Sequence, residues 1–269
     1  MFGNFTIADR VAYEFMRIDL RCRRELQGGR LVSERDYVTA LGTRIRDGFF
    51  HEFDCYSQTL RPSDEQGNGA DGIIVFRYEN QVKIGVFEAK RPQLSHLDYR
   101  WDELSSRNLS HFTEQIENQR KWKDVFAVWE MFLNELPDND LSPPFEPFGS
   151  TCIWHSDAYR FAGRNGLYTR PWRTTDLSAL AEKSSINIYK VVYDIISCKK
   201  GRPLSINPSD DSVTVINPGD NDITMEVPLP LPRELDYDPR VAAFMEKNRF
   251  ESYTYLNLSK GFDGKVILE

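Results

Sequence analysis

Residues 72–90, GIIVFRYENQVKIGVFEAK, decide the fold of this chain. Two runs rich in β-branched and aromatic residues, 72–78 and 82–90, flank a short polar segment at 79–81. This pattern is typical of two antiparallel strands joined by a tight turn. Pro92 ends the second strand, because proline cannot donate a hydrogen bond to a β-ladder. We therefore predict a β-hairpin in the first half of the chain.

The second strand of this hairpin ends in charged residues. Side chains alternate between the two faces of a strand, so Glu88 and Lys90 share a face with the apolar residues that precede them. Burying an acid and a lysine there is costly unless they are paired or bind a metal ion. A turn centred on Asn80 places residue 72 opposite Glu88, and a register one residue away places Asp71 there. In either register the carboxyl groups of Asp71 and Glu88 are neighbours.

The rest of the chain supplies elements around the hairpin. They are predicted, in order, as helices at 7–27 and from Ser33, a strand at 49–60, the hairpin, a helix from Ser110 to Leu136, a proline-rich break at 137–147 and a strand at 150–155; residues 177–199 fit either a helix or a strand. This order predicts an α/β fold with a central mixed β-sheet flanked by helices.

The composition changes after residue 200. Prolines cluster there and acids outnumber bases, although the runs SVTVI (212–216) and ITMEV (223–227) fit short strands. We predict a main domain over 1–200 and a Pro-rich acidic C-terminal extension over 201–269, a β/loop appendage packed on the core. A homodimer, or a partner subunit bound through this C-terminal region, is a further expectation.

The overall composition predicts a folded, cytoplasmic protein. Hydrophobic residues make up 40% of the 269 residues, which is enough for a real core. The formal net charge of -7 counts mildly against a nucleic-acid partner, although the field at a cleft matters more than the total. No apolar stretch approaches the roughly 20 residues that span a bilayer, and no secretory signal is visible, so no membrane partner is expected. The four scattered cysteines fit free thiols in a reducing cytosol.

Two further polar residues fall on the apolar stripes of predicted helices. Glu34 shares a stripe with Val38 and Leu41, one turn from the helix N-terminus, and so points toward the sheet. It fits equally well as a favourable first-turn charge near the helix dipole. Gln115 and Gln119 lie within the stripe of the long predicted helix. Buried amides need hydrogen-bond partners, and a polar active site would supply them.

These residue types favour the hydrolysis of phosphodiesters. Mg²⁺ takes hard oxygen ligands, here the carboxylates of Asp71 and Glu88, the carbonyl of Ala89 and water. Such a metal ion lowers the pKa of a bound water, with Mn²⁺ as an expected substitute for Mg²⁺. Lys90 then orients or helps to deprotonate that water and stabilises charge in the transition state. Glu34 is expected to hold a second metal ion, directly or through water.

The ordered set of motifs resembles the PD-(D/E)xK nuclease superfamily. The motifs are a helix with Glu34, then Gly69-Ala70-Asp71, then Phe87-Glu88-Ala89-Lys90, then a helix with Gln115. The resemblance covers roughly residues 31–155, about half of the chain. It implies a restriction-endonuclease-like core and dependence on Mg²⁺.

The resemblance also assigns roles to single residues. It implies that Asp71, Glu88 and Lys90 form the active triad and that Glu34 is the first-helix acid of many members. Gln115 is similar to the helix glutamine of RecB-like nucleases. Two positions depart from the pattern: Ala70 replaces the proline before the aspartate, and Gln119 replaces the usual tyrosine.

We therefore expect a Mg²⁺-dependent endonuclease that hydrolyses phosphodiester bonds of DNA, in restriction or another anti-phage setting. The choice between DNA and RNA stays open at this level. The alternative is a non-catalytic binding or scaffold protein that keeps the nuclease fold and uses its C-terminal region as a working surface. His155 is isolated in the sequence, and we expect it to be a surface or hydrogen-bonded histidine without a catalytic role.

Overall fold

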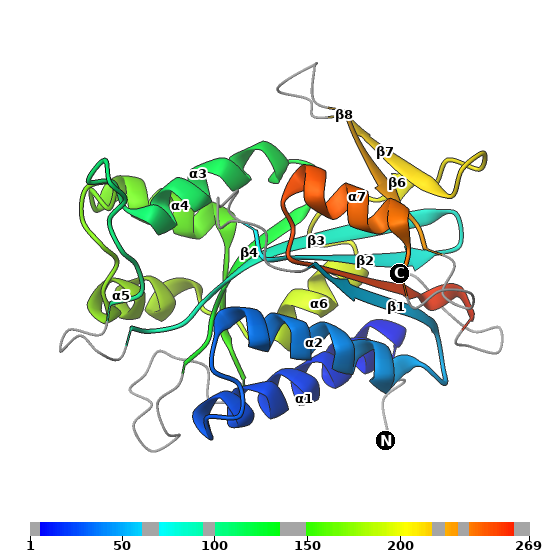
Figure 1. Ribbon diagram of the computed structural model, residues 1–269, viewed down its shortest axis with the longest axis horizontal. Coiled ribbons are helices and arrows are strands. Elements are labelled where there is room, and N and C mark those ends of the chain that lie inside the picture. The colour runs from blue at the N-terminus through cyan, green and yellow to red at the C-terminus, as the bar shows by residue number, and fades with distance from the viewer. Residues whose placement is uncertain are drawn as a thin grey trace.

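A seven-stranded mixed sheet organises the part of the chain that this computed structural model describes, residues 6–60, 70–93, 100–134, 149–216, 224–230 and 237–260. The strand order is β1-β9-β2-β3-β4-β5, with β6 paired to β3 (Figure 1). Gly69 and the predicted proline-rich break lie outside the described residues. The expected α/β class with a central mixed sheet and flanking helices is confirmed.

The described residues form seven α-helices, two 3-10 turns and nine strands. The helices are α1 (Ile7–Gln27), α2 (Glu34–Phe49), α3 (His111–Gln119), α4 (His155–Arg164), α5 (Thr174–Ser184), α6 (Ile188–Ile196) and α7 (Pro239–Asn248), with 3-10 turns η1 (Arg120–Trp122) and η3 (Leu258–Lys260). The strands are β1 (Asp54–Thr59), β2 (Gly72–Tyr78), β3 (Gln81–Lys90), β4 (Ala127–Phe132), β5 (Thr151–Trp154), β6 (Leu204–Ser205), β7 (Ser212–Ile216), β8 (Thr224–Pro228) and β9 (Ser252–Asn257). No helix within these ranges has the length and apolar character needed to cross a membrane.

Helices cover both faces of the central sheet (Figure 1). Helices α1, α2 and α6 pack on one face, where their apolar residues join those of the sheet in one core cluster. On the other face, α7 and the β7–β8 pair cover the half nearer β9, and α3, α4 and α5 cover the half nearer β5. The second face therefore carries two separate apolar clusters, with a boundary between them.

The predicted hairpin is confirmed, and its register is resolved. Gly72 pairs with Phe87 and Tyr78 with Gln81 in the antiparallel ladder of β2 and β3. The backbone amide of Asp71 continues this ladder by donating to the carbonyl of Phe87 at 2.9 Å. The observed register is thus the one that places Asp71 directly opposite Glu88.

The long helix predicted from Ser110 to Leu136 is wrong. Helix α3 ends at Gln119, a 3-10 turn follows, and residues 127–132 form the strand β4, parallel to β3. Every residue of β4 is buried, because helices cover the sheet on both sides. Such a strand has a continuous apolar run without alternation, which periodicity cannot distinguish from a buried helix segment.

Two other predicted elements change in extent or type. The strand predicted at 49–60 contains only Asp54–Thr59, because α2 continues to Phe49. The stretch 177–199, which fitted either a helix or a strand, is helical and divides into the end of α5 and α6. Asn187 caps α6, because its side chain accepts a hydrogen bond from the amide of Lys190 at 3.0 Å.

The C-terminal region is not only an appendage. Its strand β9 lies inside the central sheet, antiparallel to β1 and parallel to β2. The domain boundary expected at residue 200 therefore does not coincide with an edge of the sheet, because the predicted extension contributes β9 to it. All six residues of Ser252–Asn257 are buried, and they provide the ladder partner that β2 needs on its second edge. The two strands expected at 212–216 and 223–227 are present as β7 and β8, which pair with each other.

Candidate active site

Three acids lie in one row across the sheet. Glu88 on β3 pairs in register with Glu130 on β4, and Asp71 precedes β2 at the position opposite Glu88. Paired residues of neighbouring strands project from the same face, so the three carboxyl groups share the face covered by α3 and α4. Val86, the neighbour of Glu88 on this face, belongs to one apolar cluster of that face, and Phe132 belongs to the other. The acids occupy the boundary between these clusters.

Glu88 is the centre of this row. One of its carboxylate oxygens, Oε1, accepts hydrogen bonds from Lys90 Nζ at 2.6 Å and from Gln115 Nε2 at 2.5 Å. The side chain of Glu88 is 1% exposed, while that of Lys90 keeps 12% exposure. The second oxygen, Oε2, is buried and has no hydrogen-bond partner among the described residues. Lys90 and Gln115, two of the predicted site residues, thus both donate to Oε1 of Glu88 and leave Oε2 without a partner.

Asp71 is fixed by both neighbouring strands. Its Oδ2 accepts a hydrogen bond from the amide of Ala89 at 2.6 Å, and its backbone carbonyl accepts from the amide of Ser252 at 2.9 Å. The first bond ties the carboxyl group to β3, and the second ties the backbone to β9. Ala89 therefore contacts Asp71 through its backbone, between Glu88 and Lys90.

Burial and like charges make the two carboxyl groups of the hairpin harder to ionise. Burial raises the pKa of Asp71 well above its usual range, and the charge of Glu88 raises it further. Burial also raises the pKa of Glu88, against the opposing effect of Lys90. For Lys90, burial alone would lower the pKa, but the surrounding carboxylates outweigh it and raise the pKa. The ammonium group therefore stays charged, while Asp71 and Glu88 bind protons more tightly than ordinary carboxyl groups do.

Glu34 reaches the same end of β3 from the opposite layer. Ser33 caps α2 by accepting a hydrogen bond from the amide of Asp36 at 3.0 Å, which leaves Glu34 in the first turn. Oε1 of Glu34 accepts from the amide of Arg91 at 2.7 Å, directly after Lys90. The structure thus brings Glu34 to the end of β3, although it accepts a hydrogen bond from the backbone just after the strand and not from the groups that hold the other acids.

A pocket opens at this point. It has a volume of about 760 Å³, and Glu34, Lys90, Trp101 and His111 are among its lining residues. Lys90 and Glu34 therefore border this open space. A second pocket of about 710 Å³ adjoins it, shares His111 and is lined by Gln115. Both pockets border the N-terminal half of α3.

No family model, curated protein or solved structure matches this chain. The resemblance to PD-(D/E)xK nucleases therefore stays a prediction that rests on the residues and their geometry.

A second polar cluster lies behind Glu88 and was not foreseen. Gln119 Nε2 donates to Glu130 Oε2 at 3.2 Å, and His155 Nδ1 lies 3.0 Å from Gln119 Oε1 and 3.4 Å from Glu130 Oε1. All three side chains are buried. His155 is thus a buried, hydrogen-bonded histidine, which is one of the two environments predicted for it. Sequence reasoning missed Glu130 because it lay in a predicted helix, where its register with Glu88 was invisible. Gln119, at the position of the usual tyrosine, serves this cluster.

The fit of a divalent metal ion depends on the pair Asp71 and Glu88. Within the described ranges, no three His, Cys, Asp or Glu side chains are grouped closely enough to hold a metal ion. Mg²⁺, however, is usually held by one or two carboxylates together with water and substrate phosphates. The unpartnered Oε2 of Glu88 and the raised pKa of both acids suit a cation that would neutralise them. The donor set therefore fits Mg²⁺ or Mn²⁺.

Proposed function

We propose that this protein is a metal-dependent DNA endonuclease of the PD-(D/E)xK type, with a restriction-endonuclease-like core. The observation that carries the proposal is the environment of Glu88. Its Oε1 is held by Lys90 and Gln115, its Oε2 is buried without a partner, and Asp71 lies opposite on the next strand. A buried pair of carboxyl groups beside a lysine that borders a pocket suits a metal ion and a phosphate together.

The chain would hold the metal ion through oxygen ligands. Asp71, Glu88 and the carbonyl of Ala89 are the proposed direct ligands of Mg²⁺, and Glu34 is proposed to act through water. When bound, the metal ion would polarise the phosphate and lower the pKa of a water molecule. Mn²⁺ is expected to substitute, since it prefers similar oxygen ligands.

Lys90 has an electrostatic role in this proposal. Its raised pKa keeps the ammonium group protonated at neutral pH, so it cannot accept a proton from the attacking water. It can donate hydrogen bonds to a phosphate oxygen and stabilise the charge that develops there. Glu88 orients it by accepting a hydrogen bond from Lys90 Nζ at 2.6 Å. Of the roles expected for Lys90, orientation of the water and stabilisation of charge are therefore favoured over deprotonation of the water.

The cellular setting forms part of the same proposal. All four cysteines are free thiols, which suits the reducing cytoplasm. Restriction or another form of anti-phage defence is the process that a cytoplasmic DNA endonuclease would serve. The non-catalytic alternative gives no role to Asp71, Glu88 and Lys90, whose burial side by side is costly.

A cleavage assay tests the proposal. Purified protein is incubated with supercoiled plasmid and with Mg²⁺, Mn²⁺ or EDTA, using the wild type, Asp71→Asn and Lys90→Ala. Lys183→Ala, on the exposed surface of α5, is the matched control. We expect nicking or linearisation by the wild type and by the control with either metal ion, and loss of cleavage in both site variants. Cleavage that persists in both site variants, or in EDTA, contradicts the proposal.

A further inference from the structure

A cluster of cations forms where residues 120–125 meet residues 199–202. The tight contacts between these segments lie at Gly201 and Arg202. The Arg202 amide donates to the carbonyl of Val125 at 2.8 Å, and Gly201 packs so closely that an added Cβ would lie 2.9 Å from the amide nitrogen of Ala127. The resulting basic patch consists of Arg120, Lys121, Lys123, Lys199, Lys200 and Arg202.

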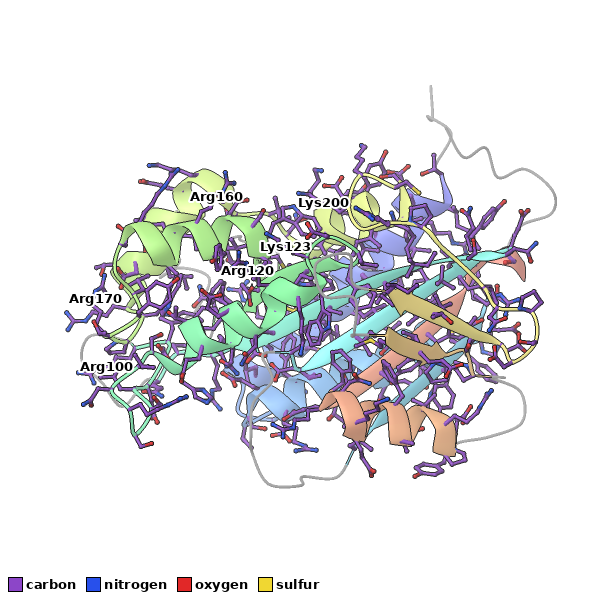
Figure 2. The ribbon with its side chains drawn as sticks, turned by 90° about the horizontal axis from the view of Figure 1, so that it is seen from above. Arg100, Arg120, Lys123, Arg160, Arg170 and Lys200 are labelled. Carbon is purple, nitrogen blue, oxygen red and sulfur yellow. The ribbon has the colours of Figure 1, made fainter. Side chains whose placement is uncertain are left out.

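Further hydrogen bonds fix the segment 199–202 to the end of α6 and to β3. The amides of Lys199 and Lys200 both donate to the carbonyl of Asp194, at 2.8 and 3.0 Å, and so close the end of α6. Lys83 Nζ donates to the carbonyl of Gly201 at 2.6 Å from the neighbouring strand β3. Seen from above, Arg120, Lys123 and Lys200 follow one another across the middle of the molecule (Figure 2). The basic patch is therefore a fixed feature of the fold.

The cations of the basic patch are held in place by neighbouring groups, but acidic side chains do not neutralise their charges. Within the described part of the chain none of the six forms an ion pair, in contrast to Arg160 with Asp157 and Arg170 with Asp176. Four of them lie over aromatic rings. The pairs are Arg120 over Tyr159 at 5.5 Å, Lys121 over Trp122 at 4.5 Å, Lys199 over Tyr193 at 4.7 Å, and Lys200 over Trp154 at 4.8 Å. A ring holds a cation in place and leaves its charge available.

This concentration of charge is unusual for the chain. The segments 120–125 and 199–202 contain six cations and one acid, Asp124, in a protein with a formal net charge of -7. Crowding six like charges on one surface is unfavourable because they repel one another. A surface that keeps such repulsion suits a partner with many closely spaced negative charges.

The position of the basic patch relates it to the candidate active site. Helix α3 carries Gln115 at the site and ends beside Arg120, about 7 Å further along the helix axis at 1.5 Å per residue. Along β3, Gly85 pairs with Ala127, against which Gly201 packs, and lies three residues or about 10 Å from Glu88. A DNA duplex carries one charge per ~1.7 Å, so about six phosphate charges lie along the 10 Å between Gly85 and Glu88.

We infer that the basic patch binds the phosphate backbone of a nucleic acid that extends from the candidate active site. The inference rests on the proposed endonuclease function and names the surface that holds the DNA beyond the reacting phosphate. The contacts are to phosphates and not to bases, so binding depends strongly on salt and weakly on sequence.

The test is fluorescence anisotropy with labelled 20-base-pair DNA in EDTA, repeated over a range of NaCl concentrations. The patch variant is Lys123→Gln/Lys199→Gln/Lys200→Gln. The matched control is Arg17→Gln/Arg21→Gln/Arg46→Gln on α1 and α2, where Arg17 and Arg21 are exposed and the side chain of Arg46 is 37% exposed. A single Lys123→Gln variant serves if the triple variant does not fold, as judged by circular dichroism.

We expect the patch variant to bind at least tenfold more weakly near 100 mM NaCl. Its plot of log K against log salt should be shallower by about 2.7, from three lost contacts at roughly 0.9 each, and that of the single variant by about 0.9. The control should keep the wild-type slope and affinity. Wild-type affinity and slope in the patch variant overturn the inference. So does a wild type that binds phosphatidylserine vesicles but no nucleic acid.

Two further arms separate this inference from the proposed function. Single-stranded DNA and duplex RNA probes show which nucleic acid supplies the backbone. Plasmid cleavage is measured on the same preparations. Binding through the basic patch without any metal-dependent cleavage contradicts the proposed function and leaves the inference standing. Normal cleavage with unchanged salt dependence in the patch variant contradicts the inference and leaves the function standing.

Discussion

Gln115→Ala is expected to weaken metal binding and catalysis without removing any proposed metal ligand. Gln115 Nε2 donates to Glu88 Oε1 at 2.5 Å, inside a site where Glu88 is 1% exposed. A hydrogen bond to a buried charged group contributes about 1.5–3 kcal/mol. Loss of this hydrogen bond leaves Lys90 as the remaining donor to Glu88. It also raises the free energy of the ionised Glu88 carboxylate.

The size of the effect follows from that hydrogen bond. Since about 1.4 kcal/mol corresponds to a factor of ten, the affinity for Mn²⁺ at neutral pH should fall between 10- and 100-fold. Loss of partners that orient metal ligands has effects of this order. The free energy of unfolding should fall by about 1.5–3 kcal/mol, because the amide is not replaced. Gln115 Oε1 has no hydrogen-bond partner among the described residues, so its removal adds no further cost.

Isothermal titration with Mn²⁺, together with plasmid cleavage rates, measures this effect. Asn118→Ala is the matched control, because Asn118 lies on the exposed face of the same helix. The control should keep the affinity and the rate of the wild type. A Gln115→Ala variant that binds Mn²⁺ and cleaves DNA as the wild type does would refute the role assigned to Gln115.

Three further predictions follow from charges and packing. Burial raises the pKa of Asp19 to about 6, above its unfolded value near 3.8, so the folded state binds the proton more tightly. The free energy of unfolding should therefore gain up to about 3 kcal/mol from this group as the pH falls from 6 to 4, and Asp19→Asn should remove that gain in denaturant titrations. Because the pKa values of Asp71 and Glu88 are raised, Mn²⁺ must displace protons, and calorimetry should show tighter binding at pH 8 than at pH 6; equal affinities would contradict this. Gly72→Ala should lower the melting temperature markedly, because the added Cβ would lie 2.4 Å from the Phe87 ring, and an unchanged melting temperature would contradict that packing.

The sequence was sufficient for the parts of the site that are local. Glu88 and Lys90 share a strand, and Asp71 is separated from them by one tight turn, so alternation and hairpin counting bring the three together. Glu34 followed from helix periodicity, because its position in the first turn directs it to the end of β3. These inferences depend on neighbours along the chain.

The parts that were missed depend on non-local pairing. Glu130 joins the acid row only through the parallel register of β4 with β3, across a segment whose apolar run fits a helix as well as a strand. His155 meets Glu130 only because β5 pairs with β4 and ends where α4 begins. Strand β9 enters the sheet from far along the chain. Single-sequence patterns contain no signal for such pairings, because they record the period of a segment and not its partner.

The most direct test of the central claim is Mg²⁺-dependent plasmid cleavage by the wild type beside Lys90→Ala, with EDTA as the control. The proposal predicts cleaved plasmid only for the wild type with Mg²⁺, and loss of cleavage in the variant although circular dichroism shows that it is folded. Equal cleavage by both proteins, or no cleavage of DNA by the wild type with Mg²⁺ or Mn²⁺, would contradict it.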